Sequence, residues 1–188
     1  MRELTYYVAT SLDGRIAAPD GDWSAFPAEG DHLEAIVREY ADTLPSHVHE
    51  ALGAHADTSR FDTVFMGWGT YTPAREAGID SPYAHLRQVV ASRQPRPVPG
   101  SIELTADPAG RIAELKQERG SGIWLAGGGT LAGALIDQID RLVLKINPVV
   151  LGAGIPLFGG IPYLPTRFER IGWRPFESGV VFAEYARR

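Results

Sequence analysis

The chain has 188 residues and a mass of 20.4 kDa, a length that predicts one domain, residues 1–188, with a sizeable core. Apolar residues make up 44% and charged residues 22%, values that exclude a disordered or membrane-embedded chain. The 18 Lys and Arg against 23 Asp and Glu give a net charge of −5, so no nucleic-acid partner is expected. The absence of cysteine excludes disulfides, thiolate nucleophiles and cysteine-ligated metals.

We expect a cytoplasmic protein without a targeting segment. Acidic residues Glu3 and Asp13 flank the short apolar run at the N-terminus, and no cleavage pattern follows it. Residues 146–166 carry no charge over roughly the length of a bilayer span, yet they include four prolines and several glycines. Such a segment cannot form a lipid-exposed helix, so it predicts a strand that leads into an apolar loop.

Buried strands alternate with helices along most of the chain. Strands are expected at residues 4–11, 61–67, 86–92, 102–106, 123–126, 141–146, 167–176 and 180–185. Helices are expected from Asp31, with an Asp31–Glu34 capping box, and over residues 107–120 and 131–137. Asp107 and Pro108 are suited to the N-cap and first position of the second of these helices. The last two strands would pair as a hairpin through residues 177–179. This order predicts an α/β domain with a mostly parallel central sheet, helices on both faces and an antiparallel C-terminal hairpin.

The sharpest local feature is a triple glycine, Gly127 to Gly129, between a buried strand and a helix that Thr130 would cap. Free backbone N–H groups and the positive end of a helix dipole, with no side chains in the way, are suited to a phosphate. The alternative is a plain tight turn with close helix–strand packing.

A second corner has the same form, with Gly67, Trp68 and Gly69 after a strand and Thr70 as a helix cap. Two such corners in one domain could hold the two halves of a dinucleotide. A Rossmann unit is the competing interpretation, but the strand after the triple glycine is not followed by the required acidic residue. No P-loop is present either, because no glycine precedes Lys and then Ser or Thr.

Several motifs occur together in one order: YYVATSLDGRIA at residues 6–17, MGWGTY at 66–71, VVASR at 89–93, WLAGGGTLAGALI at 124–136 and PVVLGAGIPLF at 148–158. In this combination the chain resembles the dihydrofolate-reductase-like family, and most closely the branch related to the reductase domain of bacterial riboflavin biosynthesis. The resemblance covers nearly the whole chain. It implies a dihydrofolate-reductase-like three-layer fold, an NADPH cofactor, and hydride transfer to a pterin-like or pyrimidine-like small molecule.

The resemblance also implies roles for particular residues. The nicotinamide would be bordered by Ala9, Ile16 and Ala17. The pyrophosphate would lie between one corner of Gly67, Trp68, Gly69 and Thr70 and a second of Ala126, Gly127, Gly128, Gly129, Thr130 and Leu131. The adenosine ribose and its phosphate would lie near Ser92 and Arg93. Trp68 and Thr130 stand where the family pattern has arginines, which leaves Arg93 as the main cation and opens the choice between NADPH and NADH.

Dihydrofolate reductases use one carboxylate at the start of the first long helix to orient the substrate and assist protonation. The matching candidate here is Asp31, with Glu29 and Glu34 as alternatives because the preceding loop makes the alignment ambiguous. The competing interpretation is that Asp31 only caps the helix.

Other residue clusters favour ordinary roles. His47, His49, His55 and Asp57 lack the spacing of a metal site, so no metal is expected, and a histidine-based hydrolase would need one. Trp23, Phe26, Tyr71 and Tyr83 could line a flat pocket, although such aromatic residues are more often core. The alternative to a reductase is a non-catalytic nucleotide-binding or sensor protein. Relatives in the riboflavin branch are often dimers, and residues 149–164 could form a homodimer interface or cover the active site.

Overall fold

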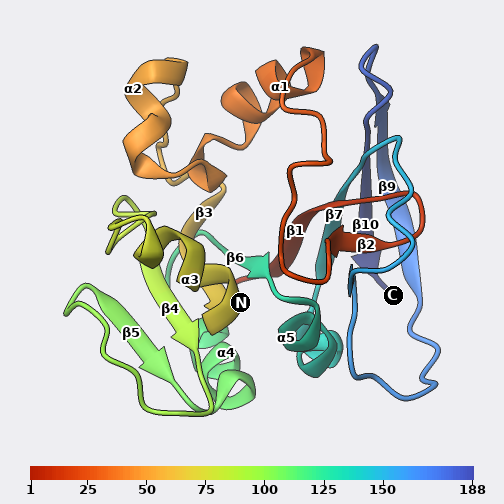
Figure 1. Ribbon diagram of the computed structural model, residues 1–188. Coiled ribbons are helices and arrows are strands. Elements are labelled where there is room, and N and C mark those ends of the chain that lie inside the picture. Colours follow the sequence, from red (N-terminus) through yellow and green to blue (C-terminus); the bar gives the residue numbers. More distant parts are fainter.

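The computed structural model describes residues 1–188 and is built around one eight-stranded sheet (Figure 1). The strand order is β5 (Ile102–Thr105), β4 (Arg87–Ala91), β3 (Phe61–Gly67), β6 (Gly122–Gly127), β1 (Leu4–Thr10), β7 (Arg141–Ile146), β10 (Val181–Arg187) and β9 (Phe168–Pro175). The first six are parallel, and β10 runs antiparallel to both β7 and β9. The expected mostly parallel sheet with an antiparallel hairpin is confirmed.

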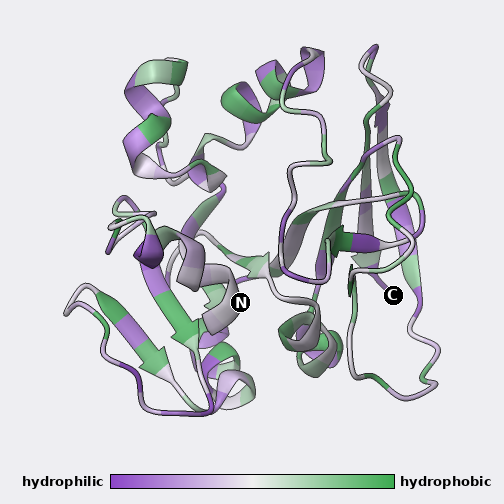
Figure 2. Cartoon of the chain, viewed as in Figure 1, coloured by the Kyte–Doolittle hydropathy of each residue, from purple (hydrophilic) through white to green (hydrophobic).

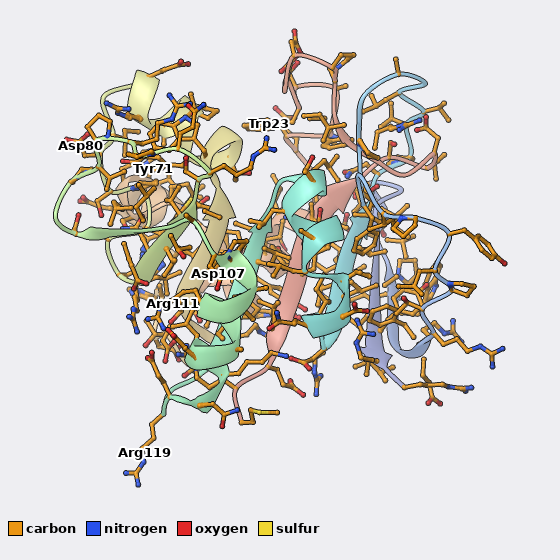
Figure 3. The ribbon with its side chains drawn as sticks, turned by 90° about the horizontal axis from the view of Figure 1, so that it is seen from below. Trp23, Tyr71, Asp80, Asp107, Arg111 and Arg119 are labelled. Atoms are coloured by element: carbon orange, nitrogen blue, oxygen red, sulfur yellow. The ribbon has the colours of Figure 1, made fainter.

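Helices cover both faces of this sheet. On one face, α1 (Asp31–Glu39) and α3 (Trp68–Glu76) pack over the strands, and on the other, α4 (Pro108–Gln117) and α5 (Gly129–Ala134) do so. Figure 3, seen from below, shows α4 and α5 lying side by side across the sheet. Parallel strands need both faces covered, which is why these strands read as continuous apolar runs.

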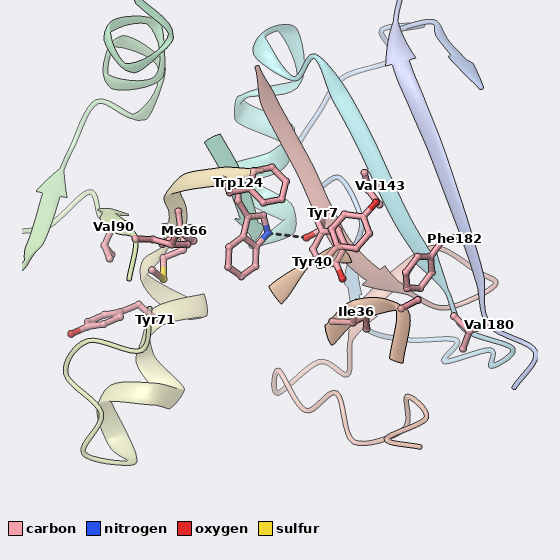
Figure 4. Packing of buried hydrophobic residues seen from close by; sticks show 14 of the residues in the cluster. Tyr7, Ile36, Tyr40, Met66, Tyr71, Val90, Trp124, Val143, Val180 and Phe182 are labelled. Atoms are coloured by element: carbon pink, nitrogen blue, oxygen red, sulfur yellow. Dashed lines mark hydrogen bonds between the residues drawn. The ribbon is translucent and has the colours of Figure 1, made fainter. Parts of the chain in front are cut away.

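The sheet separates two apolar cores. The face with α1 and α3 carries Tyr7, Trp124 and Val143, and the other carries Tyr6, Leu125 and Phe65. In Figure 4 the Trp124 indole donates a hydrogen bond to the carbonyl oxygen of Tyr7 at 3.1 Å, and the ring of Tyr7 stacks on Tyr40 with centroids 4.6 Å apart. Each such buried aromatic side chain contributes about 1.5–3 kcal/mol through removal from water.

The helix starts differ from the sequence prediction. The N-cap of α1 is Gly30, at φ 130°, and Asp31 is the first helical residue without a side-chain cap bond. The expected caps Thr70 and Thr130 lie inside α3 and α5, which begin earlier, at Trp68 and Gly129. At each of these helix starts the N-cap residue is a glycine (Gly30, Gly67 and Gly128), which has no side chain to accept a hydrogen bond. Only Asp107 caps as predicted, its carboxylate accepting from Gly110 N at 2.9 Å.

The helix ends and the shortest elements also escaped prediction. The helix expected to end at residue 120 ends at Gln117, and α5 ends at Ala134 before a 3₁₀ turn, Ile136–Gln138. The sequence did not predict three short helical elements: the 3₁₀ turns Ala41–Thr43 and Ser46–Val48, and helix α2 (His49–Leu52). It also did not predict the second small sheet, in which β2 (Arg15–Ala17) pairs with β8 (Ile155–Pro156). Two or three residues carry too little periodicity to indicate a strand.

The uncharged segment at residues 146–166 is an irregular chain after β7, as expected (Figure 2). It lies against the start of the chain and the triple glycine, since Leu157 N donates to Gly14 O at 2.9 Å and Gly159 N donates to Gly129 O at 2.8 Å. None of the helices has the length and apolar composition needed to cross a bilayer.

Candidate functional site

The two glycine corners meet at the carboxyl ends of the neighbouring strands β3 and β6. Met66 on β3 is in register with Gly127 on β6. A Cβ atom built on Gly128 would lie 3.6 Å from Thr70 Oγ1, and one on Gly67 would lie 3.8 Å from Leu131 Cδ2. Each corner therefore touches the first turn of the helix that follows the other.

The three consecutive glycines of the second corner differ in the reason why a larger residue would not fit. Gly127 and Gly128 have φ of 130° and 87°, a conformation that side chains disfavour, and a Cβ on Gly127 would meet nothing within 4 Å. A Cβ on Gly129 would instead collide with the carbonyl oxygen of Pro156. Close packing therefore explains Gly129, whereas Gly127 leaves open space beside the backbone and Gly128 is required for its positive φ.

Both helices at these corners begin without a side-chain cap. The first N–H groups of a helix have no partner within it, and they carry the positive end of its dipole. Two uncapped helix starts next to open glycine backbone form a surface suited to an anionic group such as a pyrophosphate.

The segment after β1 completes this edge of the sheet. Ala9 and Ile16 are half-buried, and Ala17 is buried and pairs with Ile155 of β8. Asp13 fixes the turn between β1 and β2, because its carboxylate accepts from Leu151 N at 3.0 Å and Gly152 N at 2.8 Å. A hydrogen bond from the Ser11 hydroxyl, together with these amides, lowers the pKa of Asp13 to about 2.

A cationic group lies beside the β3 corner. Trp68 is half-buried, and the guanidinium carbons of Arg96 and Arg75 lie 5.1 Å and 5.5 Å from the centroid of its ring. The Ser92 hydroxyl donates to Gln94 O at 2.7 Å and shapes the loop that carries Arg93, an exposed residue in no ion pair. Arg96 was missed because its contact with Trp68 joins a proline-rich loop to a distant helix. Trp68, where the family pattern has an arginine, thus supports arginines from elsewhere.

Asp31 lies at the turn of the C-terminal hairpin, which the pairing of Val181 with Ile146 places beside the carboxyl end of β7. Its carboxylate accepts hydrogen bonds from Glu177 N at 2.9 Å and Ser178 N at 3.1 Å, in the turn between β9 and β10. These bonds lower the pKa of Asp31, led by the one from Glu177. The carboxylate is thus held in its charged form at neutral pH, in which it acts as a hydrogen-bond acceptor.

The histidines and aromatic residues do not form a site. His47 and His55 are exposed, His49 packs against His85 with ring centroids 4.6 Å apart, and no three potential metal ligands come together. Of the four candidate pocket aromatics, Phe26, Tyr71 and Tyr83 are core residues or pack against the core, whereas Trp23 is exposed in the loop before α1 (Figure 3).

Two cavities open at the opposite edge of the sheet, where the parallel strands begin. Their volumes are about 360 and 430 Å³, and Arg2 and Gly120 line both. None of the residues expected to hold a cofactor or substrate lines either cavity. The carboxyl edge, with its glycine corners, remains the candidate site, in agreement with where open α/β sheets bind ligands.

Known proteins with this sequence pattern and fold were found by comparison. The family model described as the RibD C-terminal domain matches residues 2–182. Two proteins of Bacillus subtilis (strain 168) are similar in sequence. The uncharacterized protein YwjB is 34% identical, over 84% of this chain and 83% of the YwjB chain. The uncharacterized protein YyaP is 30% identical, over 68% of this chain and 74% of the YyaP chain.

Two solved structures share the fold. A putative riboflavin biosynthesis protein from Shewanella sp. PV-4 superposes with a TM-score of 0.74 at 22% identity, over 100% of this chain and 99% of its own. The diaminohydroxyphosphoribosylaminopyrimidine deaminase/5-amino-6-(5-phosphoribosylamino)uracil reductase of Thermotoga maritima superposes with a TM-score of 0.68 at 16% identity. The match covers 100% of this chain and 57% of the Thermotoga chain. The chain therefore belongs to the RibD C-terminal domain family and has the dihydrofolate-reductase-like fold of its reductase domains.

Proposed function

We propose that this protein is an NADPH-dependent reductase that transfers a hydride to a small flat heterocycle of the pterin or pyrimidine type. The observation that carries the proposal is the pair of uncapped glycine corners, which adjoin each other at the carboxyl edge of the sheet. The chain also belongs to a family that includes reductase domains.

The residues present fit such a cofactor. The pyrophosphate would be held by backbone N–H groups of Gly67 to Thr70 and of Ala126 to Leu131, since open space lies beside Gly127. Ala9, Ile16 and Ala17 would border the nicotinamide, which supplies the hydride when bound. The apolar surface of these side chains would keep water from the reacting carbon.

Arg93 and Arg96 favour NADPH over NADH. Both are exposed in the loop that follows β4, and the stacking of Arg96 on Trp68 restrains its guanidinium group beside the β3 corner. A guanidinium group can form two parallel hydrogen bonds to a phosphate. We therefore expect these residues and Ser92 to contact the 2′-phosphate and ribose that distinguish NADPH.

Thermal unfolding with and without nucleotides tests the proposal. NADPH at 100 times its dissociation constant should stabilise the protein by about 2.7 kcal/mol. A rise in Tm with NADPH, a smaller rise with NADH, and NADPH oxidation in the presence of a pterin or aminopyrimidine are expected. Absence of any stabilisation by millimolar NADPH or NADH would refute the proposal, and tight binding without turnover across such substrates would favour a sensor.

A substitution at Gly69 separates a nucleotide site from a plain turn. A Cβ there meets nothing within 4 Å and Gly69 lies in α3 without a positive φ, so Gly69→Leu should leave the fold intact. The added side chain should weaken NADPH binding at least about tenfold through steric exclusion from the corner, a loss of about 1.4 kcal/mol. The matched control is Glu76→Leu at the exposed far end of α3. Equal affinities of the two variants would show that the corner is only a turn.

A further inference from the structure

Lys145 is a lysine in an otherwise apolar part of β7. It is in register with Ala9 of β1 on one side and with Phe182 of β10 on the other. Because side chains alternate along a strand, Lys145 shares the face of Val143 and Phe182, which is the face that α1 covers. The lysine thus stands beside Ala9, near the carboxyl end of the sheet, between the strands and α1.

The ammonium group of Lys145 has no polar partner. No hydrogen bond or ion pair includes its Nζ, which lies 4.2 Å from the centroid of the Tyr7 ring. The only other lysine, Lys116, is paired in the usual way, with Asp140 Oδ2 and Gln138 O each 2.6 Å from its Nζ. Lys145 is half-buried, so its ammonium group lies partly open to the sheet face that α1 covers and has no acceptor on the protein. A cation without an acceptor beside an apolar face is costly, so its presence needs an explanation.

The groups around Lys145 do not neutralise it. From β1 comes the Tyr7 ring, and from β10 comes Glu184, whose carboxylate already accepts from Tyr40 OH at 3.0 Å. From the start of α1 come His32, bonded to Ser178 Oγ at 3.0 Å, and Asp31, bonded to the hairpin turn. No carboxylate lies within ion-pair distance of the lysine.

The electrostatics agree with this geometry. Burial lowers the pKa of Lys145 to about 8. Burial is also the main cause that lowers the pKa of His32, and the charge of Lys145 lowers it further. At neutral pH the lysine is therefore a protonated donor that gives up its proton readily.

We propose that Lys145 Nζ is the proton-bearing group on the substrate side of the site, where it donates a hydrogen bond to a carbonyl oxygen or ring nitrogen of the substrate. This inference rests on the proposed function, because the position of the nicotinamide beside Ala9 comes from the family resemblance. The substrate class is then a heterocycle with a hydrogen-bond acceptor next to the carbon that is reduced.

The proton balance of the reaction is complete with this residue. The reduced nicotinamide would supply a hydride that forms a new C–H bond on the substrate carbon as the C=N or C=O π bond breaks. Its electron pair takes the proton from the Lys145 ammonium, and the neutral amine regains a proton from water. With Lys145 as the proton donor, the reaction does not require a proton from Asp31, whose carboxylate keeps its hydrogen bonds to the hairpin turn.

The titration of Lys145 in the two redox forms of the nucleotide tests the placement without any substrate. Protein labelled with ¹³C-lysine gives two Cε signals, one of which disappears in Lys145→Met and is thus assigned. The oxidised nicotinamide carries a positive charge and the reduced one does not. We expect the pKa of Lys145 to be lower by about one pH unit with NADP⁺ than with NADPH, from the Coulomb repulsion of two nearby cations. Lys116 serves as the internal control and should not respond.

The outcomes separate the inference from the proposed function. If neither nucleotide raises the Tm, the proposed function fails and this inference with it. If both bind but Lys145 titrates identically in the two complexes, the lysine is a structural residue and the inference alone is overturned. Lys145→Met should bind NADPH within about threefold of the unchanged protein, since its side chain faces the substrate, and a larger loss would equally contradict the proposal.

Discussion

At the scale of single residues, the ring of Trp68 at the β3 corner brings two arginine side chains together. Trp68 cannot bind a phosphate as an arginine does, yet its ring supports Arg96 at 5.1 Å and Arg75 at 5.5 Å. These two arginines give the β3 corner its positive charge. A guanidinium group restrained by stacking loses less entropy on binding a ligand than a free one.

Arg96→Ala tests whether this charge selects NADPH. We expect the affinity for NADPH to fall about tenfold, in line with about 1.5–3 kcal/mol for a charge-assisted hydrogen bond less its solvent screening. The affinity for NADH should hardly change, because it lacks the 2′-phosphate. Titration calorimetry with both nucleotides measures the ratio. The control is Arg119→Ala, which removes an exposed arginine near the opposite edge of the sheet (Figure 3). An equal loss for both nucleotides would contradict the assignment of Arg96.

At the scale of secondary-structure elements, the start of α1 is tied to the β9–β10 turn. Asp31 accepts from the backbone of Glu177 and Ser178, and His32 Nδ1 lies 3.0 Å from Ser178 Oγ. A Cβ on Gly30 would come within 2.7 Å of the Ser178 side chain, so the two elements are also in close contact. This junction holds α1 over the sheet face that carries Lys145.

Asp31→Asn tests the role of this junction. An amide replaces the charged acceptor of two N–H groups, so the Tm at pH 7 should fall while NADPH still binds. The pKa of Asp31 is lowered in the folded state, so its stabilisation is present above the pKa of an unfolded aspartate and is lost as the pH falls through the lower folded value. The difference in Tm between the two proteins should therefore shrink on acidification below pH 4, measured by circular dichroism. Glu34→Gln, on the exposed side of α1, is the control and should leave the Tm unchanged. A constant difference down to pH 2 would rule out the charge as its cause.

At the scale of the whole molecule, apolar side chains remain exposed on residues 148–166 and on the edge strand β9. Tyr163 is 96% exposed and Trp173 53%, and Val150, Leu164 and Ile171 are each at least half exposed. Edge strands and exposed apolar groups of this kind favour association between copies. The same segment packs on the glycine loop, where Gly159 N donates to Gly129 O.

A homodimer is the expected result of this exposure. Light scattering after size-exclusion chromatography should give about twice the mass of one chain, 20.4 kDa. Tyr163→Glu would place a charge in the interface and should shift the mass towards that of one chain, whereas Arg119→Glu, at the opposite edge of the sheet, should not. A single-chain mass for the unchanged protein at micromolar concentration would show that the exposed residues do not form an interface.

The sequence by itself determined the eight main strands, the two glycine corners and the family, because these depend on local runs of apolar residues and on glycines with few alternatives. It did not determine the helix caps, since the N-cap position of α1, α3 and α5 is taken by a glycine, which has no side chain to cap with. Only the tertiary structure brought Asp31 to residues 177 and 178, Arg96 onto Trp68, and an unpaired Lys145 beside Ala9. These contacts join residues that are far apart in the chain. The topology of the sheet decides which distant residues meet, and no local sequence pattern encodes that topology.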